Sequence, residues 1–255
     1  MKILISILVL IVILLLVYFF CMIPNHQKIN ITNVSQNISF YNKNQAAKFI
    51  LADDDHYIKN MSNYDLIARL NTNISTNAYK VMSSKDMKEF TKLEKTILIV
   101  LTKSIENMPN MVNMPNINFI KIGDIYECGF PHTRQNIIFI PSTFFLKDKT
   151  EQLNTLKHEY IHIYQRYNPK ETELFLNKYG FKKIGIFSNL FPNEYKWRRS
   201  NPDLDGNIWQ SSNGELMFPI FSTIPPTSMA NIKDNKMEHP YEWMAYTFSS
   251  LYKIL

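Results

Sequence analysis

A long apolar run at the N-terminus constrains this chain more than any other feature. Residues 3–20 are apolar apart from Ser6, and the run extends to Ile23. A helix of at least about 18 uncharged residues can span a bilayer. Aromatic residues end the run, as at a membrane interface, and no small-residue cleavage site follows it. We therefore predict that residues 1–23 form an uncleaved signal-anchor, a transmembrane helix that makes this a single-pass membrane protein. A cleaved signal peptide is the alternative.

The charges beside this run favour one orientation. Lys2 and the free amino group precede it, and Lys28 is the nearest firm charge after it. The positive-inside rule slightly favours a cytosolic N-terminus, with the following domain on the lumenal or extracellular side. Five glycosylation sequons would serve as acceptors there, although an Asn-rich composition also generates sequons by accident: Asn30, Asn33, Asn37, Asn60 and Asn73.

Composition predicts a polar stalk at residues 24–44 and one domain at residues 45–255. Of the 255 residues, 45% are hydrophobic and 20% are charged, which is enough to bury a core. Two cysteines exclude a disulfide-dense scaffold and a four-cysteine zinc module. The net charge of +6 is scattered, and the densest basic stretch, residues 196–199, is short. We therefore expect no nucleic acid partner.

Hydrophobic periodicity predicts an α+β domain. Before residue 108 we expect a helix from Gln45, a short helix capped by Ser62, and a long helix that begins at a capping box of Ser83 and Asp86. Alternating and apolar runs predict strands at residues 118–122 and 136–140. Further helices are expected from Asp148 to the residue before Asn168, over residues 171–179, and over residues 240–253.

The sequence His158-Glu159-Tyr160-Ile161-His162 is an H-E-x-x-H motif. On a helix, residues four apart lie on one face, so both imidazoles can bind one metal ion. Glu159 lies beside them and is placed to take a proton from water that the metal activates. A random chain of this composition would contain the motif roughly once in a hundred tries, so the motif is informative. We predict His158 and His162 as metal ligands and Glu159 as the catalytic base.

Two histidines do not hold a catalytic zinc ion alone, so a third protein ligand is expected. Gln165 and Asn168 stand where metzincins have Gly and His, which excludes that family. The arrangement resembles the gluzincin type of zincin metallopeptidase, in which a Glu from a later helix completes the site. Glu242 is the best match, with Ala245 as the small residue that lets the helices pack closely, and His239 is the alternative. The other acidic candidates are Glu171, Glu173, Glu194, Glu215 and Glu238.

The resemblance also implies a fold: a zincin-like domain with a small mixed sheet, a motif helix and a C-terminal ligand helix. Residues 136–140 match the zincin edge strand, which pairs with an extended substrate. A Pro-His-Thr segment before the motif helix is also similar to membrane-anchored zincin-like proteins of large DNA viruses. The resemblance covers roughly residues 116–170 and 238–250.

Several other polar residues have two interpretations each. His132 and Arg134 could polarise a substrate carbonyl or stabilise an oxyanion, and a locally bonded loop His is the alternative. Tyr246 could donate to an oxyanion or could be a core residue. The Asp53–Asp55 run is expected to be solvated, and residues 201–206 to be a turn or to supply an acid behind a ligating His. Cys128 is expected to be a free buried thiol.

The sequence thus predicts a membrane-anchored, Zn2+-dependent metallopeptidase that acts on a peptide or protein substrate. A catalytically inactive zincin-fold membrane protein with a structural or binding role is the alternative. A non-proteolytic metal hydrolase would use the same ligands.

Overall fold

The computed structural model describes residues 38–105, 108, 113–232 and 238–251. These residues belong to one structural unit of the chain, residues 37–255. The predicted membrane segment at residues 1–23 and most of the predicted stalk lie outside the described residues. No helix in the part that is described is both long enough and apolar enough to cross a membrane.

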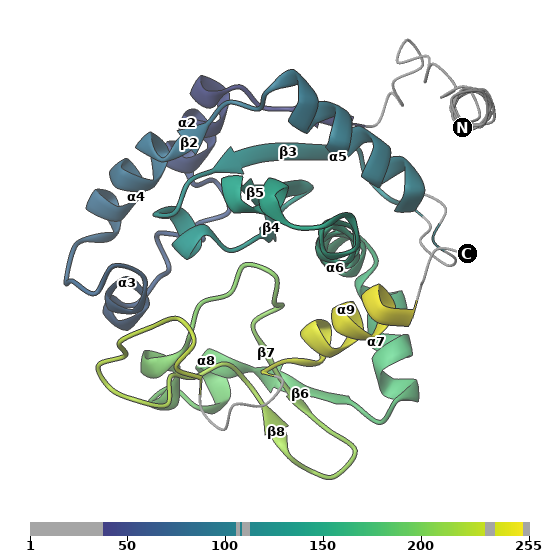
Figure 1. Ribbon diagram of the computed structural model, residues 1–255. Coiled ribbons are helices and arrows are strands. Elements are labelled where there is room, and N and C mark those ends of the chain that lie inside the picture. The colour runs from purple at the N-terminus through teal and green to yellow at the C-terminus, as the bar shows by residue number, and fades with distance from the viewer. Residues whose placement is uncertain (1–37, 106–107, 109–112, 233–237, 252–255) are drawn as a thin grey trace, which may run out of the picture. The chain divides into compact units, whose positions relative to one another are not determined.

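Helices and strands are mixed along the chain, as expected for an α+β domain (Figure 1). The strands are β1 (Ile38–Phe40), β2 (Met87–Lys88), β3 (Ile117–Ile122), β4 (His132–Arg134), β5 (Ile137–Pro141), β6 (Lys182–Ile186), β7 (Asn207–Gln210) and β8 (Leu216–Met217). The α-helices are α2 (Lys43–Ala52), α3 (Asn63–Leu70), α4 (Thr76–Lys85), α5 (Lys92–Ile105), α6 (Lys149–Tyr167), α7 (Pro169–Lys178), α8 (Phe187–Leu190) and α9 (Pro240–Leu251). Short 3-10 turns are η2 (Tyr126–Gly129), η3 (Ser142–Leu146) and η4 (Glu194–Trp197).

The larger sheet is mixed and has five strands in the order β1-β3-β5-β4, with β2 also paired to β3. Strands β1, β3 and β5 run parallel, whereas β4 pairs antiparallel with β5, with His132 opposite Phe139. The strand at residues 136–140 was expected at the edge, and this expectation is wrong. Strand β5 lies inside the sheet, and the three-residue strand β4 forms the edge.

Helices cover both faces of this sheet, which explains why β5 is buried along its whole length. Ile138 and Ile140 face a core that includes residues of α5 and α6, such as Leu98 and Leu156. Ile137 and Phe139 face the opposite core, built from α2, α3 and α4. The side chains of a strand alternate between faces, so a single apolar strand contributes to both cores.

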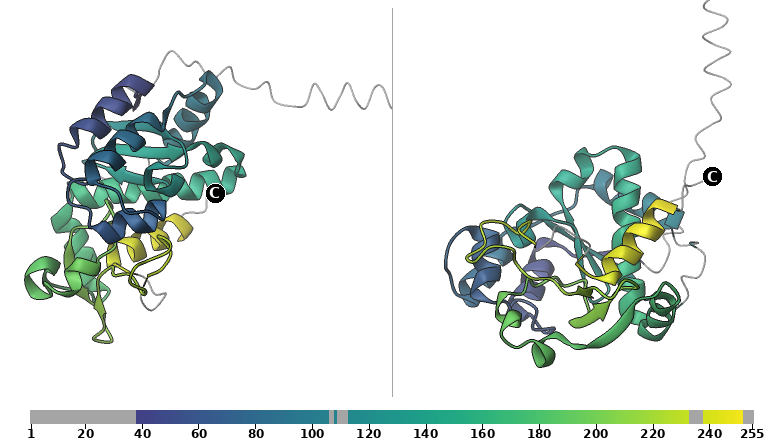
Figure 2. Two further views of the ribbon diagram at one scale, coloured as in Figure 1. Left: turned by 90° about the vertical axis from the view of Figure 1, so that its left-hand side faces the viewer. Right: turned by 90° about the horizontal axis from the view of Figure 1, so that it is seen from below.

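Helix α9 lies alongside α6 (Figures 1 and 2). Met244 and Ala245 of α9 are buried in the same core as Tyr160 and Ile161 of α6. The smaller sheet, β6-β7-β8, is antiparallel, and Trp209 of β7 joins the same core. Close packing of two helices across a small residue such as Ala245 is what the predicted ligand helix requires.

Two predicted helix starts are confirmed, and in both the capping side chain bonds to backbone N–H groups within the first turn of its own helix. Ser62 caps α3 in a capping box with Asp65, and Asp148 caps α6 by accepting from the backbone N–H groups of Thr150 and Glu151. The predicted start at Ser83 and Asp86 was wrong, because these residues end α4 and precede β2. Helix α5 begins later, where Thr91 and Glu94 bond reciprocally to each other's backbone N–H groups.

The folded unit also begins before the predicted boundary at residue 45. Ile38–Phe40 pair with β3, and Asn42 caps α2. The polar composition of residues 24–44 suggested a stalk throughout. A three-residue strand and one capping residue hardly change the average polarity of residues 24–44. Composition alone therefore does not locate the start of the folded domain.

Candidate metal centre

The motif helix α6 places its three chemical residues toward the interior. His162 and Glu159 are 1% and 4% exposed, and His158 is partly buried. The apolar face of the same helix, including Leu156 and Ile163, packs into the core and fixes the rotation of the helix about its axis. The positions of the apolar residues along α6 therefore determine which side of the helix presents the two histidines.

Glu242 reaches the same point from α9. Its Oε2 lies 3.2 Å from Nε2 of His158 and 3.7 Å from Nε2 of His162, and the two imidazole nitrogens are 3.0 Å apart. These three side chains form a group that can hold a metal ion. Ligands held at about 2.0–2.1 Å from a tetrahedral zinc ion would be separated by about 3.3 Å, so the three observed separations fit such an ion.

Gln165 orients one of the histidines. Its Oε1 lies 2.8 Å from Nδ1 of His162, and its Nε2 donates to the Tyr241 carbonyl at 2.9 Å. An amide oxygen accepts only, so Nδ1 carries the proton and Nε2 presents its lone pair to the ligand group. Sequence reasoning used Gln165 only to exclude metzincins. Its position three residues after His162, one helical turn away, was a usable signal for this contact.

A second set of contacts holds Glu242. Asn201 donates to Oε1 of Glu242 and to Oε1 of Glu238, at 3.0 Å in each case. Glu238 in turn pairs with Arg199. Oε1 of Glu242 is thus fixed by the protein, while Oε2 faces the histidines. The sequence marked residues 201–206 only as a turn or a source of an acid, and the contact of Asn201 with Glu242 was not predicted, because this loop is far from both helices in the sequence.

The electrostatics of the group favour a bound cation. Burial alone would raise the pKa of Glu242, but His162 and His158 outweigh it and lower that pKa well below its ordinary value. Burial lowers the pKa of His162, and the carboxylates of Asp203 and Glu242 more than offset this, raising it to about 10. The carboxylates of Asp203, Glu242 and Glu159 thus favour positive charge at the position of the imidazoles, which a metal ion would supply.

Glu159 is separate from the ligand group. Its Oε2 is buried and has no hydrogen-bond partner among the described residues. Burial raises the pKa of Glu159, the carboxylates of Asp203 and Glu242 raise it further, and His162 and Arg166 lower it only in part. A buried carboxyl that holds a proton more strongly than usual is suited to accept one.

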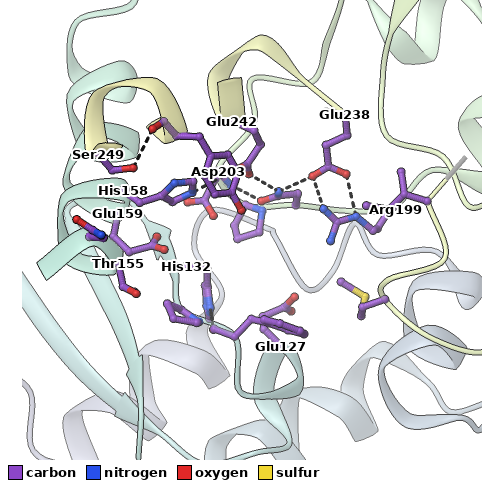
Figure 3. Close-up of a pocket in the computed structure, with 18 of the residues that line it drawn as sticks. Glu127, His132, Thr155, His158, Glu159, Arg199, Asp203, Glu238, Glu242 and Ser249 are labelled. Carbon is purple, nitrogen blue, oxygen red and sulfur yellow. Dashed lines mark hydrogen bonds and ion pairs between the residues drawn. The ribbon is translucent and has the colours of Figure 1, made fainter. Parts of the chain in front are cut away.

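The group opens onto a cavity of about 770 Å³, a volume typical of ligand sites. His158, Glu159 and Glu242 line it together with residues from several other elements, notably His132, Glu127 and Arg199 (Figure 3). In Figure 3, His132 and Glu127 lie below the metal group, and Glu238 and Arg199 lie to one side of it. The cavity thus joins the motif helix to the edge strand β4.

The alternative third ligand, His239, has another role in the structure. Its Nδ1 accepts from the backbone N–H of Tyr241 at 3.2 Å, which caps the start of α9, and its Nε2 lies 3.2 Å from Asp205. The remaining acidic candidates, Glu171, Glu173, Glu194, Glu215 and Glu238, are not part of the ligand group in the described structure.

Arg134 and the acidic run at Asp53–Asp55 form a structural ion cluster. Arg134 is 1% exposed, donates to Asp53 at 2.8 Å, and pairs with Asp55. The expectation of a solvated acidic run was therefore wrong for Asp53, which is 1% exposed. Arg134 does not line the metal cavity, so the structure does not place it for oxyanion stabilisation.

Tyr246 and Cys128 complete the predicted set. Tyr246 lines the cavity and its ring lies 4.5 Å from that of His158; it is 56% exposed, so it is not a core residue. Cys128 is a free thiol, as expected, but only partly buried, and its Sγ lies 3.4 Å from the Arg69 carbonyl oxygen.

The loop at residues 201–206 contributes an acid to the edge strand. Oδ1 of Asp203 accepts from the backbone N–H of Thr133 at 2.9 Å and also from the Thr133 hydroxyl. Arg166 lies 3.9 Å from the same carboxylate. The backbone donor of β4 that faces away from β5 at Thr133 is therefore already paired within the chain.

Comparisons with models of known protein families, with curated proteins and with solved structures found no match. The functional argument therefore rests on the geometry of the site.

Proposed function

We propose that the chain is a zinc metallopeptidase of the gluzincin type, anchored in a membrane by residues 1–23. One observation carries the proposal: His158, His162 and Glu242 converge from two helices, beside a buried Glu159 whose Oε2 has no hydrogen-bond partner among the described residues. Structural ion pairs do not require a base of this kind next to them. The nitrogen and oxygen donors suit zinc, with a fourth position left for water or substrate.

Three features support zinc at this group. The ligand separations fit a tetrahedral ion, Gln165 fixes the tautomer of His162, and Asn201 fixes one oxygen of Glu242. When bound, zinc supplies Lewis-acid polarisation of a peptide carbonyl and lowers the pKa of water toward about 7. The acidic surroundings of His162 stabilise the added positive charge.

The chain's own residues then have distinct roles. Glu159 takes the proton of the attacking water and passes it to the nitrogen of the leaving amine. Its burial keeps the proton transfer away from solvent. The cavity walls hold the peptide beside Glu159, which reduces the entropic part of the barrier.

The alternative function is an inactive zincin-fold protein that binds a partner. One observation favours it: Asp203 pairs with the backbone N–H of Thr133 on β4, the position that an extended substrate would use at an edge strand. An active enzyme would bind its substrate without that donor, or would displace Asp203.

The deciding experiment is peptide-library cleavage by the purified full-length chain, compared with Glu159→Gln. We expect cleavage by wild type and a loss of about 100- to 10,000-fold in the variant, which is the usual contribution of a general base. Both proteins should hold zinc equally, because Glu159 is not a ligand. Zinc-loaded wild type that cleaves no peptide in the library would contradict the peptidase proposal and favour the binding role.

A further inference from the structure

A second cavity, of about 520 Å³, lies next to the metal cavity, and the two share residues 199–202 as a wall. Its volume is typical of ligand sites. The edge strand β4 borders both spaces, since His132 lines the metal cavity and Arg134 lines the second one. Four arginines line the second cavity, which we call the arginine cavity: Arg134, Arg166, Arg198 and Arg199.

Two of these arginines have close carboxylate partners inside the chain. Nε of Arg134 donates to Asp55 at 2.9 Å. Nε of Arg199 donates to Glu238 at 3.0 Å. These two guanidinium groups are therefore neutralised by the protein itself, and they add little net charge to the cavity.

The acidic residues in the wall of the arginine cavity are Asp55 and Asp205. Asp55 is held by Arg134, as described above. Asp205 lies 3.6 Å from Nζ of Lys183 and 3.2 Å from Nε2 of His239. Both negative charges thus have partners of their own within the chain.

Arg198 differs from Arg134 and Arg199, because it has no carboxylate partner among the described residues. Its Nη1 donates to the Tyr195 carbonyl at 3.1 Å, and its Nη2 donates to the Asn60 carbonyl. Its guanidinium carbon lies 4.0 Å from the centre of the Tyr195 ring, a stacking contact that fixes the plane of the group. A guanidinium has five N–H donors, and these bonds use only two of them.

Arg166 also donates mainly to neutral oxygens, which include the Gln135 carbonyl at 2.8 Å and the Pro202 carbonyl at 2.9 Å. Its carboxylate partner, Asp203, is 3.9 Å away and already accepts from the backbone N–H of Thr133. Burial lowers the pKa of Arg166, and Asp203 offsets this only in part. A closer anion would therefore stabilise this cation.

A ligand can reach both of these arginines. The Arg166 side chain is 28% exposed, and Arg198 is partly exposed. A guanidinium with free donors matches the paired oxygens of a carboxylate or a phosphate group.

The rest of the wall is partly apolar. The side chains that give it this character are Phe187, Tyr195, Leu204 and Pro219. A bare inorganic ion would leave this surface in contact with water. A ligand with an oxyanion group and an apolar body would use both the arginines and the apolar wall.

We propose that the arginine cavity binds a small organic anion, with a phosphate or carboxylate group bound by the free donors of Arg198, further positive charge from Arg166, and an apolar body against Phe187 and Tyr195. The inference is independent of the proposed peptidase function, because neither Arg166 nor Arg198 lines the metal cavity.

The test is calorimetric titration of the zinc-loaded full-length chain with phenyl phosphate and with benzoate. Benzyl alcohol serves as the uncharged probe, and inorganic phosphate as the probe without an apolar body. We expect one of the two aromatic anions to bind more tightly than both of these, and the tighter of the two identifies the oxyanion group.

Variants locate the binding. Arg198→Gln should weaken it by about 10- to 100-fold, the usual effect of losing hydrogen bonds to a charged group. Arg198→Lys keeps the charge without the planar fork, so its affinity should lie between those of wild type and Arg198→Gln. Lys196→Gln removes an exposed cation two residues away that does not line the cavity, and it should bind as wild type does.

Three outcomes would overturn the inference: no binding of either aromatic anion to wild type, binding no tighter than that of benzyl alcohol, or binding that the Arg198 variants leave unchanged. The first two need no variant, so poor folding of a variant does not affect them. The third would also be the result if the anions bound the zinc ion, because Arg198 lies outside the metal cavity.

Discussion

The metal group and the Arg134 cluster both bring acidic and basic side chains together from distant parts of the chain, but they balance charge differently. Arg134 lies between Asp53 and Asp55, so the cluster supplies its own cation. At the metal group, Glu242 faces two imidazoles, with the carboxylates of Glu159 and Asp203 near enough to shift the pKa of His162. A cluster with its own cation is a structural element, whereas carboxylates gathered around two imidazoles favour an added positive charge, which a metal ion can supply.

We expect the largest effect from a substitution of Glu242, which belongs to the metal group and not to the Arg134 cluster. Glu242→Ala removes a ligand and should abolish stoichiometric zinc binding and lower the free energy of unfolding, since ligation also supports the fold. Glu242→Asp should retain only part of the zinc binding. Its shorter side chain moves the carboxylate by far more than the ~0.2 Å tolerance of ligand distances. Elemental analysis measures both, with Glu171→Ala, an exposed Glu on α7, as the control. Full zinc occupancy in Glu242→Ala would refute the assignment.

Breaking the Arg134 cluster should affect stability and leave the metal site intact. Arg134→Met leaves Asp53 and Asp55 without their arginine, and removing one partner of a buried pair costs about 3–5 kcal/mol. Chemical denaturation measures the loss, and zinc stoichiometry should stay at the wild-type value in the folded variant. A variant that keeps its stability but loses zinc would reverse the distinction between the two regions.

Gln165→Ala should give a smaller effect on the metal side. It removes the acceptor that orients His162, and the loss of such a supporting contact weakens metal affinity by about 10- to 100-fold. Competition with a zinc chelator measures the change. Gln210→Ala, whose side chain bonds only locally to the Gly214 carbonyl, is the matched control and should bind zinc as wild type does.

Acid should also weaken the Arg134 cluster, and this is the smallest of these effects. Burial would raise the pKa of Asp55, but the hydrogen bond and charge of Arg134 outweigh it and lower that pKa. A lowered pKa in the folded state adds stability above the unfolded value of about 3.9, and this is lost as the pH falls through the folded value. The denaturation midpoint should therefore fall less between pH 5 and pH 3 in Asp55→Asn than in wild type. Equal falls would contradict the pairing.

Local patterns predicted the parts of this site that lie within one helix. The spacing of His158 and His162 and the cap at Asp148 are set by neighbours in the sequence, and the structure has both. Glu242 came from a resemblance to known sites, because no pattern in α9 alone distinguishes it from a solvated Glu.

Contacts across long sequence distances could not be predicted in the same way. Asp53 was misinterpreted because its partner Arg134 lies 81 residues away. Strand β5 was placed at the edge because β4, with three residues, is too short to produce a periodic signal. Asn201 and Asp203 come from a loop whose course depends on the whole fold, so their contacts with Glu242 and Thr133 had no sequence signal.

Membrane anchoring by residues 1–23 is tested independently of the site. The length and apolar composition of the run predict that the full-length chain resists carbonate extraction from membranes. A soluble mature chain that begins after residue 20 would show a cleaved signal peptide.

Zinc stoichiometry of the purified full-length chain tests the central claim most directly. After reconstitution, elemental analysis should find close to one equivalent of zinc in wild type and almost none in His158→Ala and His162→Ala, because each variant removes one of the converging ligands. Well-folded wild type that holds no zinc, or histidine variants that hold as much as wild type, would contradict the account.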